Sequence, residues 1–420
     1  MQNFRIKLSL FLNYFVFAIL LNSVGTVILQ VQRNYNITES AASVLEAFKD
    51  LSIAAASFLI ASYVVRIGYK KTMLIALGLV TVACLVMPSL NSFLMTKVLF
   101  ATVGVGFALI KVTVFATIGL ITKDSKEHAS FMSFIESFFM VGILTGYFIF
   151  SAFVDDVHPE STAWFKVYYI LAALSFLAFL LLLTSPLDES SVHSEKSTSL
   201  TDDFGGMLKL IIIPIVLVFI FSAFFYVLIE QSIMSWLPTF NNKVLKLPTA
   251  LSIQMASILA ASTAIGRFLS GLLLRKVNWY ALLTVCLLLA AGLVLLTVPL
   301  ASKAGDHVIT GWGNAPLVAF MFPIIGLLLA PVYPAINSVI LSTLPKNMHG
   351  PMSGLIVIFS ALGGTSGSII TGNIFHAYGG QTAFYFSLLP IAILVVILFF
   401  YYRLQKKHTA NVEFNSTASH

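Results

Sequence analysis

The chain has 420 residues, of which 58% are apolar and only 10% are charged, whereas about 25% of residues are charged in an average soluble domain. So few charged side chains cannot cover the surface of a water-soluble protein of this length, which excludes an ordinary soluble enzyme and indicates lipid surroundings. The formal net charge of +7 is spread over single residues and small groups, so it does not indicate nucleic-acid binding.

Apolar stretches long enough to cross a bilayer recur along the whole chain, since a span takes about 20 helical residues. The predicted spans are 8–31, 41–65, 72–91, 93–121, 130–153, 164–184, 210–237, 251–274, 279–300, 316–341, 352–375 and 383–402. The sequence therefore predicts an all-α membrane protein with twelve transmembrane helices.

Basic residues predict the orientation of these spans. With the N-terminus inside, most lysines and arginines fall in segments on the inner side, as the positive-inside rule requires. We therefore expect both termini in the cytoplasm and the protein in a membrane such as the bacterial inner membrane.

The longest polar interruption, residues 185–206, has the composition of a solvated linker. It divides the chain into a six-helix bundle at 1–184, a cytoplasmic linker at 185–209, a second six-helix bundle at 210–402 and a cytoplasmic tail at 403–420. Two such halves are typical of transporters that hold their substrate between repeats near the membrane midplane. No phosphate-binding loop of the form G-x-x-x-x-G-K-[ST] occurs, so ATP hydrolysis is not expected.

The inner loop between spans 2 and 3 resembles the signature G-x-x-x-D-[RK]-x-G-[RK]-[RK] of the major facilitator superfamily. Arg66, Gly68 and Lys70 match it, while Ala61 and Val65 stand where the family has Gly and Asp. The resemblance implies two pseudo-symmetric six-helix bundles and a conformational role for Arg66, Gly68 and Lys70. The charge-relay role of the family's Asp does not carry over to Val65.

Two further segments resemble the fucose permease branch of that superfamily, whose members are largely proton-coupled sugar symporters. Span 7 ends in YVLIEQSIMSWLP at 226–238, and span 8 ends in GRFLSGLLLR at 266–275. The chain departs from the branch at Asn22-Ser23, where the branch has Asn-Asp, and at Lys111, where span 4 of the branch carries a Glu. These departures leave both a sugar substrate and the usual proton site open.

Charged residues inside spans are candidate functional residues, because a charge at the bilayer centre costs about 2.5–3.5 kcal/mol. In span 2, Glu46, Lys49 and Asp50 share one helix side. We interpret them as a proton site in which Asp50 is the preferred carrier, with Glu46 and Glu230 of span 7 as further candidates. The alternative is an ion cluster at a helix end.

Lys111 lies close to mid-depth in span 4 and could bind an anionic substrate group. Alternatively, it could be a fixed counter-ion for Asp50 or Glu46. Glu136 of span 5 and Arg267 of span 8 are predicted to pair across the seam and close the inner side; the alternative satisfies each charge within its own half. Small residues repeating every four positions in spans 5, 8 and 11 support a close seam between helices.

Polar groups that could contact the substrate include Asn22 in span 1, Gln231 in span 7, and Tyr333 and Asn337 in span 10. Together with Lys49 and Lys111 they form the predicted substrate site, although an interhelical hydrogen bond would equally explain each amide and phenol. Pro331 and Pro334 are predicted to interrupt span 10.

The sequence thus predicts a monomeric, proton-coupled secondary transporter that moves a small polar solute by alternating access. Sugars, amino acids, nucleosides and organic anions are the candidate solutes, and uptake by symport is favoured. Proton-driven export of a metabolite or drug is the main alternative, and a membrane-embedded transferase is a remote one. We expect no cofactor and no metal.

Overall fold

The computed structural model describes residues 2–61, 64–90, 92–122, 125–158, 160–189, 209–274, 276–301, 309–345 and 348–417. Within these ranges the chain forms helices and connecting turns, without a β-strand. The predicted linker lies largely outside the described residues, and so does the side chain of Arg66.

The first half of the chain forms a group of long helices with short connecting helices. They are α1 (Gln2–Asn22), α2 (Val24–Tyr35), α3 (Glu39–Ala42), α4 (Val44–Ala61), α5 (Val64–Ile67), α6 (Tyr69–Val86), α7 (Phe93–Ile121), α8 (Ser125–Ser151), the short η1 (Ala163–Lys166) and α9 (Val167–Leu183). We call this group the N-terminal half.

The helices after the predicted linker form a second group, which we call the C-terminal half. Its helices are α11 (Pro214–Met234), α12 (Leu237–Lys243), α13 (Thr249–Leu273), α14 (Trp279–Ala301), η3 (Trp312–Asn314), α15 (Leu317–Met321), η4 (Phe322–Ile324), α16 (Ile325–Leu329), α17 (Val332–Thr343), α18 (His349–Tyr378), α19 (Gly380–Tyr385) and α20 (Leu388–Thr417). The last of these extends the predicted span 12 well into the predicted tail.

Eleven helices of the described chain are long and apolar enough to cross a membrane. They correspond to every predicted span except span 2. The helix at that place, α4, has the length of a span but carries three charged residues within it. The predicted all-α membrane fold is therefore confirmed.

Spans 1 and 10 contain breaks well inside their predicted ranges. Span 1 bends at Ser23, between α1 and α2, where Oγ of Ser23 donates to the carbonyl of Leu20 at 2.7 Å; such back-bonding bends helices. Span 10 breaks at η4, which contains Pro323, and again before α17 at Pro331. Pro334, predicted to interrupt the span, instead lies in the first turn of α17, where a missing N–H disrupts no hydrogen bond.

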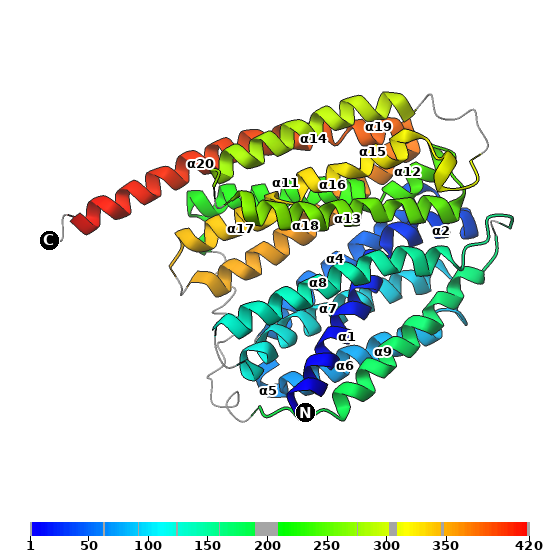
Figure 1. Cartoon of the computed structure of the whole chain (residues 1–420), viewed down its shortest axis with the longest axis horizontal. Helices are drawn as coiled ribbons and strands as arrows, with labels where there is room; N and C mark the ends of the chain where they lie inside the picture. The colour runs from blue at the N-terminus through cyan, green and yellow to red at the C-terminus, as the bar shows by residue number, and fades with distance from the viewer. Residues whose placement is uncertain are drawn as a thin grey trace.

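The most extensive contacts between the two halves join four helix pairs. These are α4 with α18, α8 with α13, α2 with α12 and α3 with α18. We call the end that carries α2, α3 and α12 the outer end and the opposite one the inner end, following the predicted topology. Figure 1 shows the halves converging at the outer end, whereas their helix axes diverge toward the end where both chain termini lie.

Small residues have two different roles in this packing. Gly142 of α8 faces Ala18 of α1, and Gly266 of α13 faces Leu327 in its own half, so these close approaches lie within the halves. Gly364 of α18 is different, because it faces Asp50 across the seam. The predicted seam of small residues is therefore present in span 11, but the glycines of spans 5 and 8 pack inside their own bundles.

Candidate functional site

The three charged side chains of α4, which we call the α4 cluster, are buried at the seam. Lys49 forms an ion pair with Glu46, and its Nζ lies 3.4 Å from Oδ1 of Asp50. Glu46 is 0% exposed, Lys49 5% and Asp50 7%. Oδ2 of Asp50 is buried without a hydrogen-bond partner in the described part of the chain. Helical spacing thus brings the three charges together, as the sequence predicts.

The α4 cluster is bonded to the opposite half. Ser235, directly after α11, donates from Oγ to Oε2 of Glu46 at 2.8 Å. The same hydroxyl lies 3.3 Å from Oε1 of Gln231, which places this predicted substrate residue beside the cluster. On α18, Gly364 approaches Asp50 so closely that a Cβ would overlap its carboxylate. The cluster is sealed by contacts between the halves.

Four other charged residues, which we call the central charges, lie deeper in the spans. Lys111 of α7 and Glu136 of α8 belong to the N-terminal half and are exposed; Glu230 of α11 and Arg267 of α13 belong to the C-terminal half and are partly exposed. Lys111 is within electrostatic range of both Glu136 and Arg267. Because charges are costly in lipid, we infer that these side chains face water between the halves.

The structure does not bring the predicted gate residues to ion-pair distance. Nη2 of Arg267 lies 4.0 Å from Oε1 of Glu230 in its own half. Glu136 forms no ion pair with another described residue. In this conformation, therefore, Arg267 lies beside an acid of its own half, as in the alternative interpretation. The pair of Glu136 with Arg267 stays a prediction for a state in which the inner ends approach.

Two tyrosines surround Glu230. Tyr226 lies one turn earlier on α11 and donates to Oε1 of Glu230 at 2.8 Å. The rings of Tyr226 and Tyr333 stack with centroids 5.6 Å apart, and the hydroxyl of Tyr333 lies 3.0 Å from Oγ of Ser360. Asn337 is half-buried one turn further along α17. Two predicted substrate residues of span 10 therefore share one side of α17, and Tyr333 reaches the surroundings of Glu230.

The predicted substrate residue Asn22 lies apart from the central charges in the helix bend. Its side-chain amide donates to the carbonyl of Ala18 at 2.9 Å. This hydrogen bond within α1 gives Asn22 a structural role. Such a role is the alternative to ligand contact for any polar residue in a span.

The loop that resembles the superfamily signature is held by the beginning of the linker. Gly68 precedes α6 with a positive φ of 90°, a conformation that favours glycine. Nζ of Lys70 donates to the carbonyls of Leu183 at 3.0 Å and Ser185 at 2.8 Å, and its backbone N–H donates to Oε1 of Glu189 at 2.6 Å. A carboxylate is thus present at this loop, but it comes from Glu189 because the motif position is Val65.

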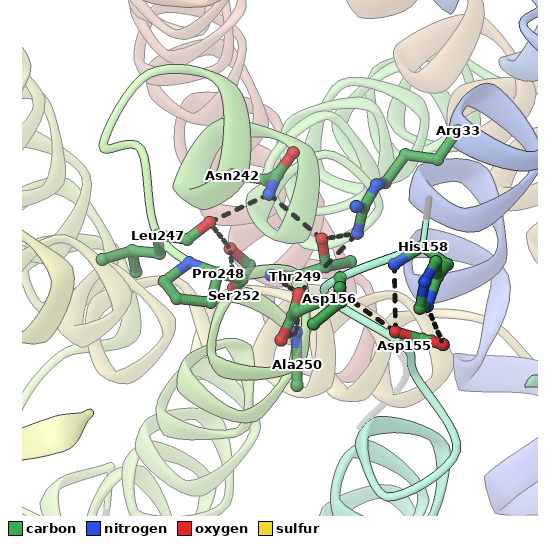
Figure 2. A network of polar contacts seen from close by, with 11 residues as sticks. Arg33, Asp155, Asp156, His158, Asn242, Leu247, Pro248, Thr249, Ala250 and Ser252 are labelled. Carbon is green, nitrogen blue, oxygen red and sulfur yellow. Dashed lines mark hydrogen bonds and ion pairs between the residues drawn. The ribbon is translucent and has the colours of Figure 1, made fainter. Parts of the chain in front are cut away.

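A polar network joins the halves at the outer end, as Figure 2 shows. Asp156, after α8, accepts hydrogen bonds from the backbone N–H groups of Thr249 and Ala250 at the start of α13. Arg33 of α2 donates to the Thr249 hydroxyl and lies 3.7 Å from Oδ1 of Asp156. Among the described residues, Asp155 bonds only within its own loop, and backbone and side-chain hydrogen bonds from His158 lower its pKa.

A second outer contact has Glu39 at its centre. This carboxylate of α3 pairs with Lys243 of α12 and lies 3.2 Å from Nδ1 of His376 on α18. Burial raises the pKa of Glu39, but the hydrogen bonds and charge of these partners outweigh that effect and lower it below its ordinary value. The closed outer end is thus held by ion pairs in addition to apolar packing.

Three residues of these contacts were not predicted as site residues: Glu39, Asp156 and Ser235. All three lie at helix ends or in loops, where charged and hydroxyl residues are ordinary, so depth in the membrane gives no signal for them. The sequence did contain one signal for a cap from elsewhere in the chain. Pro248 precedes α13 at Thr249, and its side chain cannot cap the helix.

Comparison with known proteins gives the family. A family model of the Major Facilitator Superfamily matches residues 10–368. No curated protein matches the sequence.

Solved structures of similar fold extend over nearly the whole chain. A bacterial homologue of the human lysosomal transporter Spinster, in an inward-facing and unoccupied conformation, has a TM-score of 0.79 at 15% identity, covering 97% of this chain and 98% of its own. A mutant of the nucleoside transporter NupG has a TM-score of 0.76 at 13% identity, with 94% and 99% covered. The E. coli fucose:proton symporter FucP has a TM-score of 0.60 at 16% identity, with 96% and 99% covered.

At these identities the structural likeness shows the fold, and the family match covers most of the chain. The fucose permease branch stays a prediction within that family. The helical membrane fold, with eleven helices of the described chain long and apolar enough to span a membrane, and the family match agree on one assignment: this multi-pass membrane protein belongs to the Major Facilitator Superfamily of transporters.

Proposed function

We propose that the protein is a proton-coupled transporter that takes up a small polar solute by alternating access, in a bacterial inner membrane with both termini in the cytoplasm. The described conformation is the one in which the outer end is closed. The buried α4 cluster, sealed by Ser235 and Gly364 of the other half, is the observation that carries the proposal. The likeness of the fold to a D-xylose-proton symporter and to the fucose:proton symporter supports this class.

The charge count of the α4 cluster gives the physical reason for coupling. Two carboxylates and one ammonium have a net charge of −1 when all are ionised, and all three side chains are buried. Burying an uncompensated charge is costly, and a single added proton cancels it. Oδ2 of Asp50, which lacks a hydrogen-bond partner among the described residues, is the atom at which we place this proton.

This arrangement links the proton to the conformational change. Opening the outer end separates Ser235 from Glu46 and removes α18 from Asp50, so water reaches the cluster and stabilises its negative charge. Closing the outer end excludes that water and favours the protonated cluster. A proton bound from outside therefore promotes the closed outer end, which is the direction that uptake by symport requires.

The proposal is tested with purified protein in liposomes that contain a pH-sensitive dye. A panel of sugars, nucleosides, amino acids and organic acids is added outside, and solute-dependent proton entry is recorded. We expect Asp50→Asn to reduce proton entry at least tenfold, while Asp155→Asn, the same substitution in an exposed loop, leaves it unchanged. Proton entry that persists undiminished in Asp50→Asn and Glu46→Gln would reject the α4 cluster as the coupling site.

A further inference from the structure

The central charges include one cation from each half, and the two influence each other electrostatically. Lys111 of α7 and Arg267 of α13 are within electrostatic range. Like charges repel, and the repulsion grows as the distance falls. Approach of the inner ends would bring the two cations closer together. This is unfavourable unless an anion lies between them.

Neither cation is fully satisfied by the protein. Lys111 forms no hydrogen bond or ion pair with another described residue, and its ammonium group lies 5.8 Å from the ring centroid of Phe107. An ammonium group has three donors, and here they are left to solvent. Nη2 of Arg267 lies 4.0 Å from Oε1 of Glu230, which is too long for a hydrogen bond. The buried Nε of Arg267 has no hydrogen-bond partner in the described chain.

The acids of the group do not remove this unused donor capacity. Glu230 accepts a hydrogen bond from Tyr226 at 2.8 Å in addition to the Arg267 contact. Glu136 lies in electrostatic range of Lys111 but forms no ion pair with it. The acids thus offset the net charge of the group, while the N–H donors of both cations remain available to a ligand.

We propose that the transported solute carries a carboxylate or phosphate group, which Lys111 and Arg267 hold between the two halves. The proposal rests on the transport function proposed above and specifies its substrate class. A bound anion offsets the repulsion between the two cations and lets the inner ends approach. A neutral sugar or nucleoside has no group that performs this task.

Ligand binding to purified protein tests the substrate class without a pH gradient. The midpoint of thermal unfolding is measured with succinate, L-glutamate, glucose 6-phosphate and inorganic phosphate, and with glucose and uridine as neutral solutes. We expect at least one anion to raise the midpoint and neither neutral solute to do so. The organic carboxylates and the phosphates form separate arms and distinguish the two anionic groups.

Variants then locate the anion. Lys111→Gln and Arg267→Gln should each weaken its binding by about ten- to a hundredfold, the effect of removing a charged hydrogen-bond donor. Lys111→Arg keeps the charge and should retain binding. Lys97→Gln is the matched control, since Lys97 lies at the outer start of the same helix, with its ammonium 4.3 Å from the ring centroid of Phe93.

The proposal is overturned if only neutral solutes stabilise the protein, if none of the anions does, or if Lys111→Gln and Arg267→Gln bind the anion as tightly as the unchanged protein. These measurements do not depend on proton coupling. Anion binding without proton entry would reject the proposed coupling and leave the substrate class intact, and proton entry driven by neutral solutes alone would do the reverse.

Discussion

Asp156 of the N-terminal half caps the first turn of a helix in the C-terminal half, through hydrogen bonds from the backbone N–H groups of Thr249 and Ala250. The residue before α13 is Pro248, which makes no side-chain cap. The first turn of a helix has unsatisfied N–H groups that favour an anionic acceptor. The start of α13 therefore receives its cap only while the outer ends of the halves are in contact.

Removing this cap should shift the protein toward an open outer end. An N-cap contributes about 0.5–2 kcal/mol, so Asp156→Ala should raise the ratio of outer-open to outer-closed molecules by about two- to thirtyfold. Distances between spin labels at positions 166 and 310, both exposed at the outer end, measure this ratio. Asp155→Ala is the control, because the hydrogen bonds of Asp155 in the described part of the chain all lie within its own loop; an equal shift in both variants would refute the role of the cap.

Acidification should release the contact of Glu39 with Lys243 and His376. The pKa of Glu39 is below 4.5 when the outer end is closed, so the closed state binds fewer protons there than a state in which the partners are separated. The contact is therefore fully stabilising above pH 4.5 and is lost as the pH falls through the lowered pKa. The spin-label distances should lengthen in that window.

Two variants check the assignment of this pH dependence. Glu39→Gln should be shifted toward the outer-open state at every pH and show no further change below pH 4.5. Lys243→Gln removes the main partner, so the pKa of Glu39 should rise and the transition should move to higher pH. A transition that is the same in Glu39→Gln would show that another group titrates.

Neighbouring glycines of α18 should respond differently to the same substitution. A Cβ on Gly364 would overlap the carboxylate of Asp50 across the seam, whereas a Cβ on Gly363 would overlap the backbone of Phe224 on α11 in the same half. Gly364→Ala should therefore favour the outer-open state with little loss of thermal stability. Gly363→Ala should lower the unfolding midpoint instead, and identical behaviour of the two variants in both assays would contradict this division.

Gly68 should be intolerant of any side chain. Its φ of 90° is unfavourable for other residues, and a Cβ would lie 2.8 Å from Oε2 of Glu189. We expect Gly68→Ala to cost about 1–3 kcal/mol, measured as a lower unfolding midpoint. Gly271→Ala, at a helical position with open space around it, should be neutral or stabilise the protein by up to about 1 kcal/mol. A midpoint in Gly68→Ala that matches the control would exclude strain at this loop.

The sequence by itself determined the membrane class, the helices and the grouping of charges along one helix. Apolar runs of sufficient length must form helices in lipid, because every backbone polar group needs a partner there. Glu46, Lys49 and Asp50 had to share a side of α4, because residues three and four positions apart lie next to each other on a helix. The break of span 10 at Pro331 was predicted, whereas the break at Pro323 was not, and Pro334 is tolerated in a first turn that only the structure shows.

Only the tertiary structure decided which charges meet. Arg267 lies 4.0 Å from Glu230 of its own half, because the inner ends diverge, and no periodicity in one helix specifies the conformation of two bundles. The cap supplied by Asp156 and the bond from Ser235 to Glu46 join residues far apart in the chain. Local sequence encodes helix faces, whereas contacts across the seam depend on how the two halves are placed against each other.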